Sequence, residues 1–103
     1  MEQCELREQN YKNGGRVYQS VARSPKLTLG AKGLYAYLAA FCGEGNECYP
    51  SVETICEEIN VTKTAMYKYM KELVEHGVVE KKQTYVGNLK SKVIYSLTHD
   101  VRE

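Results

Sequence analysis

The side chains best suited to chemistry in this chain are the lysines, hydroxyls and tyrosine between Thr62 and Lys71. Lysine ammonium groups pair with phosphates or guanine acceptors, and threonine hydroxyls bond to phosphate or base. A tyrosine adds a hydroxyl and an apolar ring that can meet a thymine methyl or a sugar. The backbone N–H groups of a helix start, here beside Thr62, can hold a phosphate. The sequence therefore predicts contacts with double-stranded DNA by Thr62, Thr64, Tyr67, Lys68 and Lys71.

The spacing of the apolar residues predicts that these side chains share one face of a helix from about Lys63 to His76. At about 100° per residue, one arc collects the apolar positions and the opposite arc collects the polar ones. Glu72 and Glu75 fall on the outer half and favour the alternative, a solvated face on an ordinary amphipathic helix. The apolar arc holds Met66, Tyr69, Met70, Leu73 and Val74, and the outer arc holds Thr64, Tyr67, Lys68 and Lys71.

After this helix, Gly77 and the β-branched residues that follow it predict a β-hairpin. We expect strands from Val78 to Val86 and from Lys92 to Thr98, joined by a loop over residues 87–91. Lysines near the tip of such a hairpin can reach an adjacent groove or the DNA backbone, although they equally serve solubility or protect a sheet edge. The candidate contacts here are Asn88, Lys90 and Lys92.

The distribution of charge supports a nucleic-acid contact more than the net charge of +1 does. Residues 1–59 carry six basic and eight acidic side chains, whereas residues 60–96 carry seven lysines and three glutamates. The positive charge therefore gathers on the expected helix and hairpin, where a phosphate backbone would attract it. A bias of this size is also compatible with a solvated lysine surface.

Upstream residues supply the elements that would hold this helix in place. Thr28 can cap a helix that ends near Cys42, and Ser51 can cap a second helix with apolar residues at helical spacing. Alternating residues from Val17 to Val21 predict a short strand, and another is expected at Cys48-Tyr49. We expect a polar arm at 1–15, a single domain at 16–98 and a tail at 99–103.

Composition argues against several other classes of protein. The chain of 103 residues has no P-loop, no spaced Ser/His/Asp set and only two histidines, so we expect neither an enzyme nor a cofactor. The four cysteines lack C-x-x-C spacing, so we expect no metal site, with Cys42 and Cys56 as buried free thiols. No apolar run is long enough to span a membrane and the start is too polar for a signal peptide, which predicts a cytoplasmic protein.

Three segments together resemble a known family: LTLGAKGLYAYL, YPSVETICEEINV and TKTAMYKYMKELVEHGVVEK. They resemble winged helix-turn-helix domains of phage, plasmid and transposon proteins, among them the N-terminal domains of replication initiators and primosome-loading proteins. The resemblance implies an α+β fold with a three-helix core and a β-hairpin wing, and duplex DNA as the partner. It also implies that the exposed residues of the recognition helix are Lys63, Thr64, Tyr67, Lys68 and Lys71. It also implies a transcriptional regulator or replication-control protein of a mobile element. The alternative is a protein-interaction or oligomerisation module of a replication or primosome complex.

A DNA-binding protein of this kind can act as a two-fold dimer, and we expect any homodimer to use the N-terminal segment. The reason is that few residues follow the last expected strand, so a long dimerisation helix has no place there. An isolated strand near the N-terminus would expose an edge to a second copy, although it can equally dock on its own domain. The candidate contacts are Leu6, Tyr11, Val17, Tyr18 and Val21.

Overall fold

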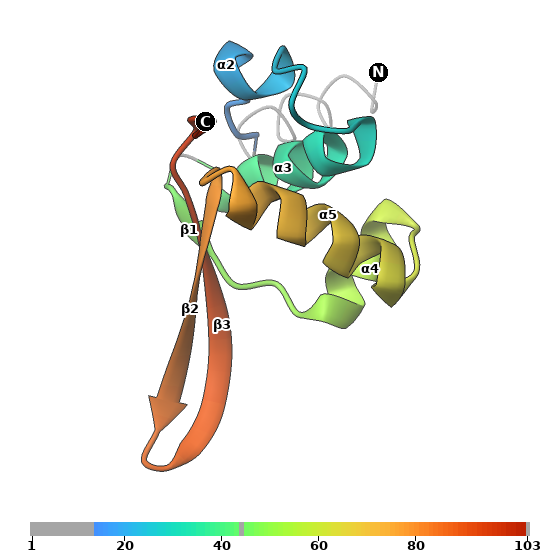
Figure 1. Cartoon of the computed structure of the whole chain (residues 1–103). Coiled ribbons are helices and arrows are strands. Elements are labelled where there is room, and N and C mark those ends of the chain that lie inside the picture. The colour runs from blue at the N-terminus through green and yellow to red at the C-terminus, as the bar shows by residue number, and fades with distance from the viewer. Residues whose placement is uncertain (1–13, 44, 103) are drawn as a thin grey trace, which may run out of the picture.

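The structure is a computed structural model that describes residues 14–43 and 45–102. Figure 1 shows the helices gathered at one end of the molecule and a long β-hairpin reaching away from them. In chain order the elements are α2 (Gln19–Ala22), α3 (Leu29–Cys42), β1 (Glu47–Cys48), α4 (Val52–Ile59), α5 (Lys63–Glu75), β2 (Val79–Val86) and β3 (Leu89–Leu97). This is the expected α+β architecture of a winged helix-turn-helix, with β2 and β3 as the wing.

Side-chain caps set the starts of the three long helices, as the sequence predicts. Thr28, Ser51 and Thr62 each accept a hydrogen bond from the backbone N–H three residues further on, at 3.3, 3.1 and 3.1 Å. Each cap satisfies one of the N–H groups that a helix start leaves unpaired. Asn60 ends α4 in the left-handed conformation, with φ of 58°, and so turns the chain from α4 into α5.

The core lies where α3, α5 and the base of the sheet meet. Leu34, Leu38 and Leu73 are almost fully buried there, beside Tyr35 and Ile55. The apolar arc predicted for α5 is confirmed for Met66, Met70 and Leu73, whereas Val74 is 36% exposed, so the expected core position at Val74 is wrong. Val74 lies at the edge of that arc and stays exposed, because the helix packs on a narrower stripe than its apolar sequence offers. No helix among residues 14–43 and 45–102 is long and apolar enough to cross a membrane.

Gly30 is a point of close contact between α3 and α5. A Cβ at Gly30 would lie 2.2 Å from the ring of Tyr69, so the ring occupies the space that a side chain would need. A Cβ at Gly33 would meet no atom within 4 Å among the residues described. The first glycine therefore serves packing between the helices, and the second does not.

The sheet is antiparallel in the order β1-β3-β2. The expected five-residue loop is wrong, since β2 and β3 are joined by Gly87 and Asn88 alone and Val86 pairs with Leu89. Gly87 has a φ of 64°, the left-handed conformation that a two-residue hairpin turn requires. The register shifts between Gln83 and Tyr85, and the Thr84 hydroxyl bonds to both backbone groups of Lys92 there. Lys90 therefore lies in a strand rather than in the expected loop, whereas Lys92 lies in a strand as expected.

The strand expected from Val17 to Val21 is also wrong, because this segment forms the short helix α2. The helical turn buries Val21 completely, and the Tyr18 backbone N–H donates to the hydroxyl of Tyr35 over 3.1 Å. Three alternating residues are too few to outweigh these contacts with α3. The edge that a second copy could have paired with is consequently absent from residues 17–21.

Residues 98–102 pack back onto the helices. The Ser20 hydroxyl donates to the His99 carbonyl over 2.9 Å, and the Arg102 backbone N–H donates to the carbonyl of His76. Val101 lies half-buried against the core. The end of the chain thus joins α2 to the C-terminus of α5.

Candidate nucleic-acid interface

The outer face of α5 is exposed along the whole length on which the sequence placed the DNA contacts. Met66, Met70 and Leu73 anchor the opposite face in the core, which orients the outer face towards solvent. Tyr67 is 51% exposed although it is a large aromatic residue. The structure brings these exposed side chains together on one surface, the α5 face, formed by Lys63, Thr64, Tyr67, Lys68 and Lys71.

The lysines of the α5 face differ in how they are paired. Lys63 lies 3.5 Å from the carboxylate of Glu53 on α4, and Lys71 lies 3.9 Å from Glu75. The pKa of Glu53 is lowered by a hydrogen bond to its own backbone N–H and then by Lys63. Lys68 has no ion pair with any described residue. Exposed ion pairs of this kind contribute little to stability, so phosphate oxygens can replace these carboxylates as partners of the lysines.

Glu72 does not belong to the outer face that the sequence assigned to it. Its carboxylate accepts a hydrogen bond from the Thr28 backbone N–H over 3.1 Å and one from the Thr28 hydroxyl over 2.7 Å. The negative charge therefore lies at the N-terminus of α3, where it is favourable. This removes one of the two acidic residues that favoured an ordinary solvated face.

Thr62 is the N-cap of α5 as well as a candidate DNA contact. Its hydroxyl oxygen accepts from the Ala65 backbone N–H, so the cap uses this oxygen as an acceptor. The hydroxyl proton is free to donate to a phosphate, and the first N–H groups of α5 point the same way. Thr62 is exposed, as a contact residue has to be.

The wing divides its lysines between two faces. Side chains alternate along a strand and directly paired residues share a face, so Lys81 lies on the face of buried Val79 and Tyr95. Lys82 lies on the other face, 3.9 Å from Glu47. Because α5 packs against the first of these faces, Lys81 is on the α5 side of the wing.

The three wing residues singled out from the sequence do not form one cluster. Lys90 pairs with Tyr85, which shares the α5 side with Lys81 by alternation along β2. The Lys92 ammonium lies 3.8 Å from the ring centroid of Tyr49, a cation–π contact on the other face. Asn88 is exposed in the turn. Lys81 and Tyr85 are candidates that the sequence analysis missed, although alternation from Val79 would have pointed to them.

Tyr95 lies at the junction between the α5 face and the wing. It is 3% exposed, and burial raises the pKa of its hydroxyl, with a smaller contribution from neighbouring Tyr67. Buried Tyr95 thus lies next to exposed Tyr67 at this junction. The α5 face and the α5 side of the wing therefore adjoin at Tyr67 and Tyr95.

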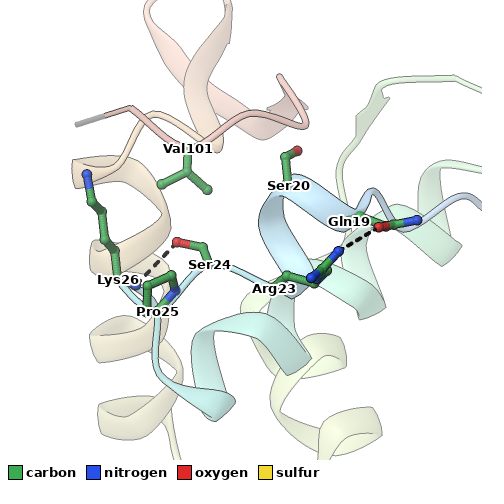
Figure 2. Close-up of a pocket in the computed structure, with 7 residues that line it drawn as sticks. All are labelled: Gln19, Ser20, Arg23, Ser24, Pro25, Lys26 and Val101. Carbon is green, nitrogen blue, oxygen red and sulfur yellow. Dashed lines mark hydrogen bonds between the residues drawn. The ribbon is translucent and has the colours of Figure 1, made fainter.

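A pocket of about 510 Å³ lies elsewhere, between α2 and the C-terminal segment. Figure 2 shows that its two cationic side chains point to opposite sides of it, and Arg23 is hydrogen-bonded to Gln19 at 3.2 Å. Lys26 donates its backbone N–H to the Ser24 hydroxyl. Because the charges do not converge, this pocket offers no site for an anion.

The three cysteines of the described region are free thiols in different surroundings. Cys48 is buried, whereas Cys42 and Cys56 are only half-buried, so the expectation that these two are buried is wrong. Cys4 lies outside the described residues. Over 14–43 and 45–102, no three His, Cys, Asp or Glu side chains gather as a metal site would require.

Comparison with known proteins gives a single family. A family model described as a helix-turn-helix domain matches residues 26–79, slightly more than half of the chain. The match begins before α3 and ends at the start of β2, so it covers the three long helices. Neither the curated proteins nor the solved structures gave a match.

Proposed function

The chain belongs to the helix-turn-helix domain family, a DNA-binding class, and from this premise we propose that it recognises a specific sequence in double-stranded DNA. We propose further that it acts as a transcriptional regulator or replication-control protein of a mobile element. The second part rests on the resemblance of its helical segments to domains of phage, plasmid and transposon proteins.

The observation that carries the proposal is the composition of the α5 face. A recognition helix contacts base edges with its N-terminal part, and Thr64, Tyr67 and Lys68 are exposed on that part. Phosphate contacts fix the position on DNA and base contacts specify the sequence. Lys71 and the wing residues Lys81 and Lys90 suit the first task, while Thr64, Tyr67 and Lys68 suit the second.

The rival function is a docking module for other proteins of a replication or primosome complex. Surfaces at the centre of protein interfaces are depleted in lysine, whereas α5 presents three exposed lysines. The turn of Glu72 towards Thr28 further reduces the negative charge on the outer face. Both observations favour a phosphate-bearing partner.

A selection from a random duplex pool at stated salt tests sequence recognition directly. Enrichment of a motif is the expected result, and recovery of no motif would contradict sequence-specific binding. On the selected duplex, Lys68→Ala combined with Lys71→Ala should weaken binding. Each lost phosphate contact should also lower the slope of log K against log salt by about 0.9. Unchanged affinity in this double variant, with native circular dichroism, would remove α5 from the interface.

Recognition of a two-fold operator would require a homodimer that leaves both α5 helices free. We propose that such a dimer uses the N-terminal segment, with Val17 and Tyr18 as exposed contacts at 45% and 41%. Val21 is fully buried, so it is no longer a candidate contact of the dimer. Leu6 and Tyr11, two other candidates, lie outside the described residues. Light scattering on the full chain and on a chain lacking residues 1–15 tests this, since a truncated protein that stays dimeric would place the contact elsewhere.

A further inference from the structure

The end of the wing carries large apolar side chains that nothing in the domain covers. Tyr85, Val86 and Leu89 are 60%, 72% and 75% exposed, and we call these three residues the wing tip. Val86 and Leu89 are directly paired and share one face, whereas Tyr85 pairs with Lys90 on the other. Figure 1 shows the hairpin ending well away from the helices. The wing tip therefore packs on none of the helices that the structure describes.

Exposed aliphatic residues at the end of a hairpin promote unwanted association between protein molecules, so their presence needs an explanation. A cross-strand pair beside a turn contributes at most about 1 kcal/mol, and threonine or tyrosine supplies a similar strand preference without an aliphatic patch. Stability of the hairpin alone consequently does not account for Val86 and Leu89.

The charges around the wing tip indicate what kind of partner it meets. Residues 81–97 include four lysines and no aspartate or glutamate. Lys90 lies directly beside the tip and has no ion pair with a described residue. An apolar end beside a lysine, on a hairpin that carries only positive charge over residues 81–97, fits a polyanion with an apolar recess between its phosphates. A DNA groove has this character, because its walls are sugars and its rims are phosphates.

The length of the wing and the spacing of the DNA grooves indicate which groove the wing tip reaches. Major and minor grooves alternate about every 17 Å along one side of a duplex, half of a helical turn of about 34 Å. A strand of eight residues such as β2 spans roughly 27 Å. With α5 in a major groove, the wing is long enough to bring its tip over the adjacent minor groove. That groove is about 6 Å wide, so it admits side chains but not a two-stranded ribbon.

We propose that the wing tip enters the minor groove next to the site of α5, and that Val86 and Leu89 insert against a base step and bend the duplex. This inference rests on the proposed function and adds a second contact to it. Apolar side chains that enter the minor groove unstack a step and kink the DNA towards the major groove. The resulting specificity comes from how easily a sequence deforms, not from hydrogen bonds to its bases.

The test compares three full-length proteins on a labelled duplex recovered from a random pool by the wild type. The tip variant is Val86→Thr with Leu89→Thr, which keeps strand preference while removing the aliphatic pair. The matched control is Leu29→Thr, since Leu29 is 86% exposed at the start of α3, away from the wing. Circular dichroism and thermal unfolding establish that all three proteins fold.

We expect the tip variant to bind roughly tenfold more weakly, the loss that removal of two partly covered aliphatic groups predicts. Its slope of log K against log salt should match the wild type, because no phosphate contact is lost. Energy transfer between dyes at the duplex ends should report a bend with the wild type and with Leu29→Thr, and a straighter duplex with the tip variant.

Unchanged affinity and bending in the tip variant would overturn the proposal while leaving recognition by α5 intact. A tip variant that binds normally but loses a dimer seen by light scattering would also overturn it, and would assign the tip to a protein contact. If the wild type enriches no duplex and binds none at low salt, the proposed function and this inference fail together. If Lys68→Ala with Lys71→Ala weakens binding and the tip variant does not, only this inference fails.

Discussion

Glu72 on α5 accepts two hydrogen bonds from Thr28, the residue that caps α3. The Thr28 oxygen in turn accepts from the Ala31 backbone N–H over 3.3 Å, so one acidic side chain orients the cap of another helix. This contact ties the start of α3 to the last turn of α5, the helix that carries the candidate DNA contacts.

We expect Glu72→Ala to lower the free energy of unfolding by about 1–2 kcal/mol, because both donors of Thr28 lose their charged acceptor. Urea unfolding measures the change. The control is Glu75→Ala, whose exposed pair with Lys71 at 3.9 Å should contribute less than about 0.5 kcal/mol. Equal effects of the two substitutions would mean that Glu72 is not part of the cap.

The two glycines of α3 should respond to alanine in opposite directions. Gly30→Ala should destabilise the domain by about 1–3 kcal/mol, because the added methyl would overlap the Tyr69 ring. Gly33→Ala should stabilise it by up to about 1 kcal/mol, since alanine is the better helix former and the site is open. Thermal unfolding of both variants checks this, and a stabilising Gly30→Ala would show that α3 and α5 do not meet there.

Truncating one side chain on the buried face of α5 and one at the edge of that face tests which face of the helix points into the core. Leu73→Ala should cost about 2–5 kcal/mol, because Leu73 is fully buried and its removal leaves a cavity. Val74→Ala should change stability by less than about 0.5 kcal/mol, since Val74 is 36% exposed. The reverse order of effects in chemical denaturation would mean that the lysine face points elsewhere.

Acid should destabilise the domain through His99. Its Nδ1 lies 2.7 Å from the Tyr35 hydroxyl and its Nε2 lies 3.1 Å from the Asn46 side-chain oxygen, while its ring stacks on Tyr18. Because Nε2 faces an amide oxygen, which only accepts, the neutral ring carries its proton on Nε2, and the Tyr35 hydroxyl donates to Nδ1. Burial correspondingly lowers the pKa of His99 below its ordinary value of 6.5.

The sign of the pH dependence follows from this lowered pKa. The unfolded chain takes up a proton at His99 at higher pH than the folded chain does, so the contribution is fully present above about 6.5 and is lost as the pH falls below it. The urea midpoint should therefore decrease from neutral pH towards pH 5, and His99→Gln should reduce that decrease. The same slope in the variant would assign the acid sensitivity to other groups.

The cysteines of the described region should differ in their rates of alkylation. Cys48 is 4% exposed, and burial, followed by the neighbouring Cys42 thiol, raises the pKa of its thiol. Because the thiolate is the reacting form, iodoacetamide should modify Cys48 more slowly than half-buried Cys56 in the folded protein. Peptide mass mapping over time measures the order. Equal rates in the native state, against a urea-unfolded control, would contradict the burial of Cys48.

The sequence by itself determined the three long helices α3, α4 and α5, their N-terminal caps and the exposed face of α5. These features are local: Thr28, Ser51 and Thr62 each bond to a backbone group three residues away, and the 3.6-residue period separates Met66 and Met70 from Lys68 and Lys71. Such patterns are visible without knowing what packs against what.

Only the tertiary structure decided which residues meet across the chain. The strand predicted from Val17 to Val21 became a helix because Tyr18 and Val21 contact α3, and the Glu72 carboxylate turned to Thr28, 44 residues away. The division of Lys81 and Lys92 between two faces of the wing depends on strand register, and one bulge changes it. The physical reason is that these outcomes come from contacts between distant residues, whose partners no local period or cap identifies.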